Sequence, residues 1–300
     1  MNALGTYLLA GKLQAVGIIS LLTVLSLLLP PFSYIISGTP FSLVTLRKGP
    51  SYAMHVLAVT VLLTTVVGYF TNLGVELGVA YALGVWSPAL LCATVLRVTE
   101  SQGLAVLAAT GVGVILVLGI YLFTDDLTVW WQAWIDSFLQ QNFAASEAGQ
   151  MRELFDATLP LINGIIASGV VISLVMTVLA ARWWQSRLFN PGGFRQEFHR
   201  LLLPKWLTII TFFCLLLSLV NTGVDQWLIR NLLIVLVVIH TFQGIASVHR
   251  TVFTRQLSRG WLIGMYSFLV FLPQMALFLA CIGMADVWVR NKKSVSGDAE

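Results

Sequence analysis

The sequence predicts an all-α membrane protein, a polytopic bundle of about nine transmembrane helices within a range of about eight to ten. Hydrophobic residues make up 58% of the chain and charged residues only 10%, whereas soluble domains carry about a quarter charged residues. The mean hydropathy is +0.87. The apolar runs are continuous and do not alternate with polar residues, which favours helices over a β-barrel.

Basic loops set the expected orientation. Residues Arg182–Lys205 hold five Lys or Arg and one acidic residue, Glu197. Because Lys and Arg are retained in the cytoplasm, this segment is predicted to be a basic cytoplasmic loop. The N-terminus is then inside, with twelve of the 17 Lys and Arg on the inner side. Nucleic-acid binding would need a basic domain outside the membrane, and no segment is long enough to form one.

The chain opens with two short apolar runs. Leu13–Leu29 contains no charge, and Pro31–Leu46 ends at Arg47 and Lys48. At ~1.5 Å per residue each run covers roughly 25 Å, enough to cross a ~30 Å core with local thinning. We expect a hairpin of two spans. A single broken helix with the N-terminus outside is the alternative.

The third to fifth spans are predicted at Ser51–Phe70, Leu77–Leu96 and Gly103–Phe123, with a kink at Pro88. Small residues recur along the fourth and fifth spans and just before the fourth. These residues are Gly74, Gly78, Ala82, Ala105, Ala109 and Gly113. Stripes of this kind let helices approach closely, so they indicate ordinary helix packing rather than a binding site.

An amphipathic segment follows over residues 127–158. Leu127–Phe143 repeats apolar residues at helical spacing and carries Trp130, Trp131 and Trp134, which suit the headgroup region. We expect this helix to lie flat on the outer membrane surface as an interfacial anchor. A lid over an outward-facing cavity is the functional alternative. Ser146–Asp156 is predicted to be a second short helix.

The last four spans complete one integral membrane domain over residues 1–290, before a polar tail at 291–300. They are predicted at Leu159–Ala181, Trp206–Val220, Asn231–Val248 and Trp261–Ala285. Between the first two of these, Phe194–Leu203 is predicted to be a short basic amphipathic helix. If Pro273 splits the last run into a hairpin or re-entrant pair, the tail returns to the inner side.

Polar residues at membrane depth are the candidate substrate-binding residues, because ionisable groups there are costly and often functional. His240 shares a helix face with Gln243 and could bind a substrate or relay a proton. Ordinary interhelical hydrogen bonding is the alternative. Glu76 is expected at the outer mouth of the fourth span, where it could simply reach water. Gln274 follows a proline, where backbone carbonyls are freed.

The basic cytoplasmic loop supplies candidates for a different role. Arg182, Arg187, Arg195 and Arg200 are predicted to contact anionic lipid or a protein partner. The alternative is that these residues serve membrane insertion alone.

No enzyme chemistry is predicted. The sequence has no HExxH, GxSxG or P-loop pattern and no carboxylate pair at helical spacing within a span. Cys92, Cys214 and Cys281 each lie in an apolar run without a CxxC pattern, so they indicate buried hydrophobes and neither a disulfide nor a metal site. We therefore expect no catalytic residue, cofactor or metal.

Several local patterns resemble the YybS-like bacterial membrane proteins, a family with a domain of unknown function, in its proteobacterial form. The patterns are Leu46-Arg47-Lys48-Gly49; Asn190-Pro191-Gly192-Gly193-Phe194; Gln243-Gly244 with Ala246 and His249; and Gly283 with Asp286 and Trp288 before a basic tail. The resemblance covers nearly the whole chain and implies a multi-pass protein of the bacterial inner membrane. The resemblance identifies no catalytic residue.

This family is grouped with Gx transporter-like folds, which include the S components of energy-coupling-factor importers and MreD. The kinship implies a transport-type protein that binds a small solute. It also implies the alternative, a non-transporting scaffold in envelope or division assembly. S components typically have six helices, and the larger number predicted here departs from them.

Overall fold

The computed structural model describes residues 2–29, 32–123, 127–143, 145–220 and 226–297, and every regular element in them is helical. Within these residues, five helical stretches are long and apolar enough to cross a membrane. They contain α4 (Pro50–Phe70), α5–α6 (Leu77–Thr99), α7 (Gln102–Phe123), α10 (Ile162–Phe189) and α13 (Gln226–Thr254). The bent pair of α11 (Gly193–Arg200) and α12 (Lys205–Leu219) makes a sixth if it counts as one span. An all-helical membrane bundle is therefore confirmed.

The N-terminal helices match the two short apolar runs. After α1 (Asn2–Leu8), α2 (Lys12–Ser26) packs against α4, and the second run forms a π-helical turn, η2 (Tyr34–Gly38), followed by α3 (Thr39–Lys48). A chain of polar side chains links these helices inside the bundle: Ser37 Oγ lies 2.7 Å from Thr23 Oγ1 and accepts from Trp86 Nε1 at 2.9 Å. The second run folds back against α2, as the Thr23–Ser37 contact shows, and this favours a hairpin over one broken helix.

The fourth span bends where proline disturbs it. Its first helix, α5 (Leu77–Tyr81), passes into a π-helical turn, η3 (Ala82–Trp86), and then α6 (Ser87–Thr99) with Pro88 in its first turn. Proline has no N–H to donate to the preceding turn, which accounts for the irregular backbone just before it. On α5, a Cβ added to Gly78 would overlap Thr65 and the Val61 carbonyl. This small residue therefore serves close packing of α5 on α4.

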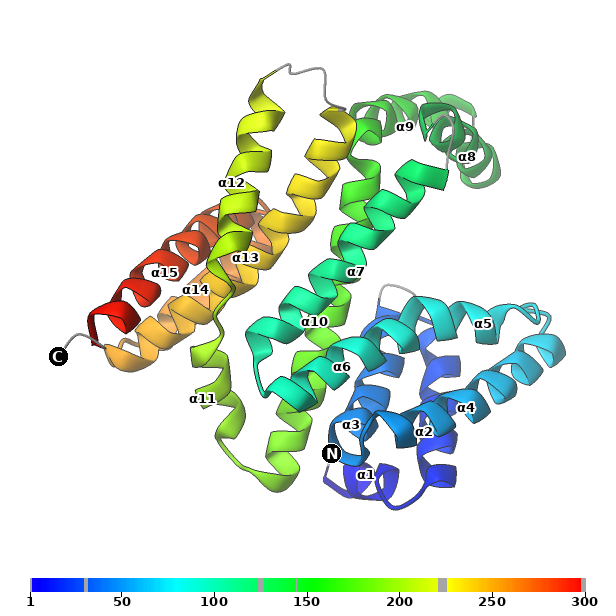
Figure 1. The fold of residues 1–300 in the computed structure, drawn as a ribbon. Helices are drawn as coiled ribbons and strands as arrows, with labels where there is room; N and C mark the ends of the chain where they lie inside the picture. Colours follow the sequence, from blue (N-terminus) through cyan, green and yellow to red (C-terminus); the bar gives the residue numbers. More distant parts are fainter. Residues whose placement is uncertain (1, 30–31, 124–126, 144, 221–225, 298–300) are drawn as a thin grey trace.

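The segment 127–158 forms two helices at one end of the bundle, α8 (Leu127–Asn142) and α9 (Ala145–Thr158), before the short η4 (Leu159–Leu161) (Figure 1). Trp131 is buried, and its Nε1 donates to Asn163 Oδ1 on α10 at 2.7 Å. Trp130 and Trp134 are about half exposed on the other side. The inner face of α8 is therefore covered by protein, while Val129, Trp130 and Trp134 lie on its exposed face.

The chain breaks between α11 and α12. These helices meet at 51°, and the four residues Leu201–Pro204 between them are not helical. Pro204 lies directly before α12, and the side chains of Leu201 and Leu203 are buried. In Figure 1, α11 lies at the end of α7 and α10 that is opposite to α8 and α9.

The last apolar run forms two helices instead of one. α14 (Gly260–Phe271) ends before Pro273, and α15 (Met275–Gly297) begins after it. α15 lies against α13, where Thr241 Oγ1 donates to the Ala276 carbonyl at 3.0 Å. Arg290 Nη1 donates to the Leu201 carbonyl at 2.9 Å, so this part of α15 lies beside the end of α11. The expected single span Trp261–Ala285 is therefore split into the hairpin that Pro273 allows.

Candidate functional site

His240 lies where α13 meets α12 and is fully buried. Its Nε2 is 3.0 Å from Thr211 Oγ1, and that hydroxyl donates to the Leu207 carbonyl at 2.8 Å. Because a hydroxyl has one proton, His240 Nε2 is assigned as the donor to Thr211. The other nitrogen, Nδ1, is buried and has no hydrogen-bond partner in the described residues.

Gln243 shares that face of α13, and both ends of its amide are engaged. Its Oε1 accepts from the Leu203 backbone N–H at 2.9 Å, and its Nε2 donates to Asp286 Oδ2 at 2.7 Å. Both Gln243 and Asp286 are buried. Leu203 belongs to the break between α11 and α12, where the helix cannot satisfy its own backbone. Gln243 therefore supplies the acceptor that this backbone needs.

Two arginines complete what we call the Asp286 network, formed by Gln243, Arg250, Asp286 and Arg290. Arg250 Nη2 pairs with Asp286 Oδ1, and Arg250 Nη1 donates to the His199 carbonyl at 3.3 Å. Arg290 Nη1 lies 3.8 Å from Asp286 Oδ2. The network thus joins α13 and α15 and holds the end of α11 through its free carbonyl groups.

The four candidate substrate-binding residues are not brought together. His240 and Gln243 are buried in α13, whereas Glu76 is exposed at the turn between α4 and α5. Gln274 is exposed at the turn between α14 and α15. Their role in binding stays a prediction, and the contacts of Gln243 give it a structural task.

The arginines of the basic loop have distinct surroundings. Arg182 Nε and Nη2 each donate to a Glu197 carboxylate oxygen at 2.8 Å, which ties α10 to α11. The guanidinium of Arg187 lies 5.5 Å above the Trp183 ring. The Arg195 guanidinium lies 5.0 Å above the Phe253 ring. The side chain of Arg200 is exposed.

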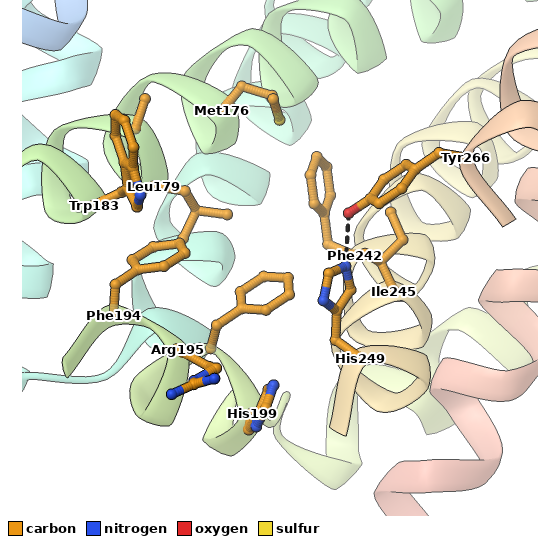
Figure 2. Close-up of a pocket in the computed structure, with 12 residues that line it drawn as sticks. Met176, Leu179, Trp183, Phe194, Arg195, His199, Phe242, Ile245, His249 and Tyr266 are labelled. Carbon is orange, nitrogen blue, oxygen red and sulfur yellow. Dashed lines mark hydrogen bonds between the residues drawn. The ribbon is translucent and has the colours of Figure 1, made fainter. Parts of the chain in front are cut away.

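A groove opens between α10, α11, α13 and α14, with a volume of about 480 Å³ (Figure 2). Its wall is almost entirely apolar or aromatic. The lining residues are Met176, Leu179, Ala180, Trp183, Phe194, Arg195, Phe198, His199, Phe242, Ile245, His249 and Tyr266. A polar pair lies in this wall, where His249 Nε2 is 2.8 Å from the Tyr266 hydroxyl.

A second hollow of about 590 Å³ adjoins the groove and shares Arg195, His199 and His249 with it. It extends to Phe253 and Arg259, and none of the described residues that line the two hollows is Asp or Glu. We call this second hollow the basic mouth. Partial burial, together with the guanidinium groups of Arg195 and Arg250, lowers the pKa of His199 at the end of α11. The mouth is therefore a region of positive potential.

Sequence reasoning missed this groove. Tyr266 and the neighbouring Ser267 lie in an apolar run, and His249 stood out only within a family-like pattern. The signal that could have found them is the basic amphipathic α11, whose apolar side carries Phe194 and Phe198 and needs neighbouring helices to cover it. Among the described residues, no group of three or more His, Cys, Asp or Glu could hold a metal ion.

Comparison with known families adds the identity of the chain. A family model described as "Predicted membrane protein (DUF2232)" matches residues 17–287. The chain belongs to this family. The YybS-like resemblance fits that match, while the likeness to S components and MreD stays a prediction. No curated protein and no solved structure matches the chain. The DUF2232 match includes the groove, the basic mouth and Asp286, and it ends before Arg290.

Proposed function

We propose that this DUF2232 protein is a transport-type, non-enzymatic membrane protein that binds a small solute in the groove between α10, α11, α13 and α14. The observation that carries the proposal is the shape of this site. It is a concave, mostly apolar space with a few polar groups at one end, which is the usual form of a small-molecule site. Its volume of about 480 Å³ falls within the range of such sites.

The topology we propose has about nine membrane-inserted units. Eight are crossings, and the ninth is the re-entrant hairpin of α14 and α15. With the N-terminus inside, the hairpin returns Arg290 and the tail to the inner side, in keeping with the retention of basic residues there. The groove and its basic mouth then face the cytoplasm, and the membrane is the bacterial inner membrane.

Ligand-dependent stabilisation tests the solute-binding proposal. Thermal unfolding of the purified protein in detergent is measured against a panel of vitamins, nucleosides, metal ions and amphipathic anions. A solute that binds the folded state stabilises it by about 2.7 kcal/mol at a hundredfold excess over its Kd. The midpoint temperature of unfolding rises as a result. Ala180→Leu, which adds bulk to the groove wall, should abolish the shift. A panel without any shift, or one in which Ala180→Leu responds like the native protein, contradicts the proposal.

A scaffold role is the second candidate, and the burial of His240 and Gln243 between the helices favours it. Both residues are fully buried, with Gln243 engaged at both ends, so this polar face holds helices together. Arg187 and Arg200 would then contact a cytoplasmic protein partner or anionic lipid, and no nucleic acid. Crosslinking and pull-down from cells test this role. A partner lost in the Arg187→Gln/Arg200→Gln variant, without loss of the protein from the membrane, supports it.

A further inference from the structure

We propose that the occupant of the groove is a phosphate-bearing lipid, with its acyl chain in the apolar groove and its headgroup in the basic mouth. This inference rests on the proposed solute-binding function and names the chemical class of the solute. It joins two separate observations, an apolar space open to the bilayer and an uncompensated basic space directly beside it.

The positive charge of the mouth is available to a ligand. Arg195 and Arg259 line the mouth and supply its charge, and none of the described residues that line it is a carboxylate. The nearby acidic residues are already engaged, because Glu197 pairs with Arg182 and Asp286 pairs with Arg250. Arg195 lies over the Phe253 ring and forms no ion pair with any acidic residue that the structure describes. Guanidinium groups bind phosphate through two parallel hydrogen bonds, so phosphate is the anion that suits this mouth.

The apolar part of the groove is accessible from the side of the bundle. Met176, Trp183 and Tyr266 are 45%, 37% and 43% exposed although they line the groove. In a membrane protein such surfaces face lipid, so a chain can enter sideways without passing through water. From Trp183 to Met176 the wall follows α10 away from the mouth for about 10 Å at the α-helical rise. A tail can therefore lie along α10 while its headgroup stays at the mouth (Figure 2).

The His249–Tyr266 pair lies at the boundary between the two spaces. The Tyr266 hydroxyl is 2.8 Å from His249 Nε2, and His249 lines both the groove and the mouth. A polar pair at this depth suits the glycerol and ester oxygens, which lie between the phosphate and the acyl chain of a phospholipid. Basic, polar and apolar residues thus follow one another along the wall in the same order as the phosphate, the ester oxygens and the acyl chain of the lipid.

Native mass spectrometry of the full-length protein, released from a neutral detergent, tests the proposal. Phosphatidic acid, diacylglycerol with the same chains, and inorganic phosphate are titrated separately. We expect one phosphatidic acid to bind at least about tenfold more tightly than diacylglycerol, from roughly 1 kcal/mol per basic residue near the headgroup. Inorganic phosphate should show no saturable binding over the same concentration range.

Matched variants locate the site. Arg195→Gln/Arg259→Gln removes two basic residues and should weaken phosphatidic acid binding about thirtyfold. Arg47→Gln/Arg255→Gln removes the same number of arginine charges from exposed positions outside both hollows, so it should leave the affinity unchanged. Ala180→Leu blocks the apolar part without touching the charge and should also weaken binding. Its thermal midpoint in lipid-free detergent shows whether it has folded.

Each other outcome overturns the inference. Equal binding of diacylglycerol means an apolar site without headgroup recognition, and saturable binding of inorganic phosphate means a free-phosphate site. An equal loss in Arg47→Gln/Arg255→Gln means diffuse attraction to basic residues. If the thermal panel finds a stabilising solute while phosphatidic acid does not bind, this inference fails and the proposed solute-binding function stands.

Discussion

Gln243 Nε2 donates to Asp286 Oδ2 at 2.7 Å, across the interface between α13 and α15. The other end of the same amide accepts from Leu203. One side chain therefore connects the carboxylate of the last helix to the broken backbone between α11 and α12. Two residues that the sequence marked for different reasons are parts of one structural network.

Removing the Asp286 carboxylate should strongly destabilise the fold. In Asp286→Ala, Arg250 and Gln243 lose their buried partner, and we expect the free energy of unfolding to fall by about 3–5 kcal/mol. Unfolding by SDS in mixed micelles measures this change. Asp156→Ala removes a carboxylate from an exposed pair with Arg152 and should cost less than about 1 kcal/mol. Equal losses in both variants would contradict the structural role of the network.

The close contact of α13 and α15 predicts a sharp difference between two glycines. In Gly244→Ala, the new methyl group would overlap the backbone of Leu279, which cannot turn away as a side chain can. We expect a loss of about 1–3 kcal/mol, as for overpacked cores. In Gly264→Ala of α14 the methyl group meets nothing within 4 Å. That control should be neutral or slightly stabilising in the same assay.

The Arg182–Glu197 pair predicts rescue by charge exchange. Arg182→Ala leaves Glu197 half-buried with only the longer hydrogen bond from Gln102 among those described, so stability should fall by about 1–3 kcal/mol. The exchange Arg182→Glu/Glu197→Arg should recover part of that loss, measured by thermal unfolding. If Arg182 instead acts mainly on lipid or a partner, the exchanged pair will be no more stable than Arg182→Glu alone.

The contact of Arg290 with Leu201 predicts the side on which the chain ends. In a background with the three native cysteines replaced by alanine, Ser296→Cys should react with a membrane-impermeant maleimide in inverted vesicles. It should stay unlabelled in intact spheroplasts. Ser146→Cys, in the predicted outer segment, should behave in the opposite way. Labelling of Ser296→Cys in spheroplasts would place the tail outside and refute the re-entrant hairpin.

His199 should report on the charge of the basic mouth. Burial and the cations Arg195 and Arg250 lower its pKa, and His249 and Arg259 add basic groups nearby. Protonation of His199 is therefore less favourable in the folded protein than in the unfolded chain. The stability that His199 contributes is fully present above its unfolded pKa, and it is lost as the pH falls through the lower folded pKa. NMR titration of labelled histidines, assigned with His199→Asn, measures the pKa. Phosphatidic acid should raise this pKa, since an anion favours the charged imidazole, and diacylglycerol with the same chains should not.

Much of the helical pattern followed from the sequence. The uncharged run Gly103–Phe123 became α7, and the repeat at Leu127–Phe143 became α8, because burial of apolar side chains and helical hydrogen bonding act locally in the chain. The split of the last apolar run at Pro273, which the sequence offered as an alternative to a single span, is also present in the structure. By contrast, the sequence could not show that Trp131 turns inward to Asn163, because these two residues are 32 positions apart.

The candidate site was harder to predict for the same reason. His240 and Gln243 were singled out because polar groups are costly in lipid. Hydrogen bonds to Thr211, Leu203 and Asp286 offset that cost as well as a ligand would. Nothing in the local pattern distinguishes the two cases. The residues of the groove drew less attention, because apolar and aromatic side chains are ordinary in a membrane protein.

By itself, the sequence determined the membrane class, most helix positions and the basic segments between them, because hydropathy, proline and charge act over a few residues at a time. The tertiary structure decided which polar groups are satisfied, where α15 returns, and where Arg195 and His199 meet the apolar wall of α10 and α14. Those features depend on helices distant in the chain packing side by side. The groove and its basic mouth exist only in that packing.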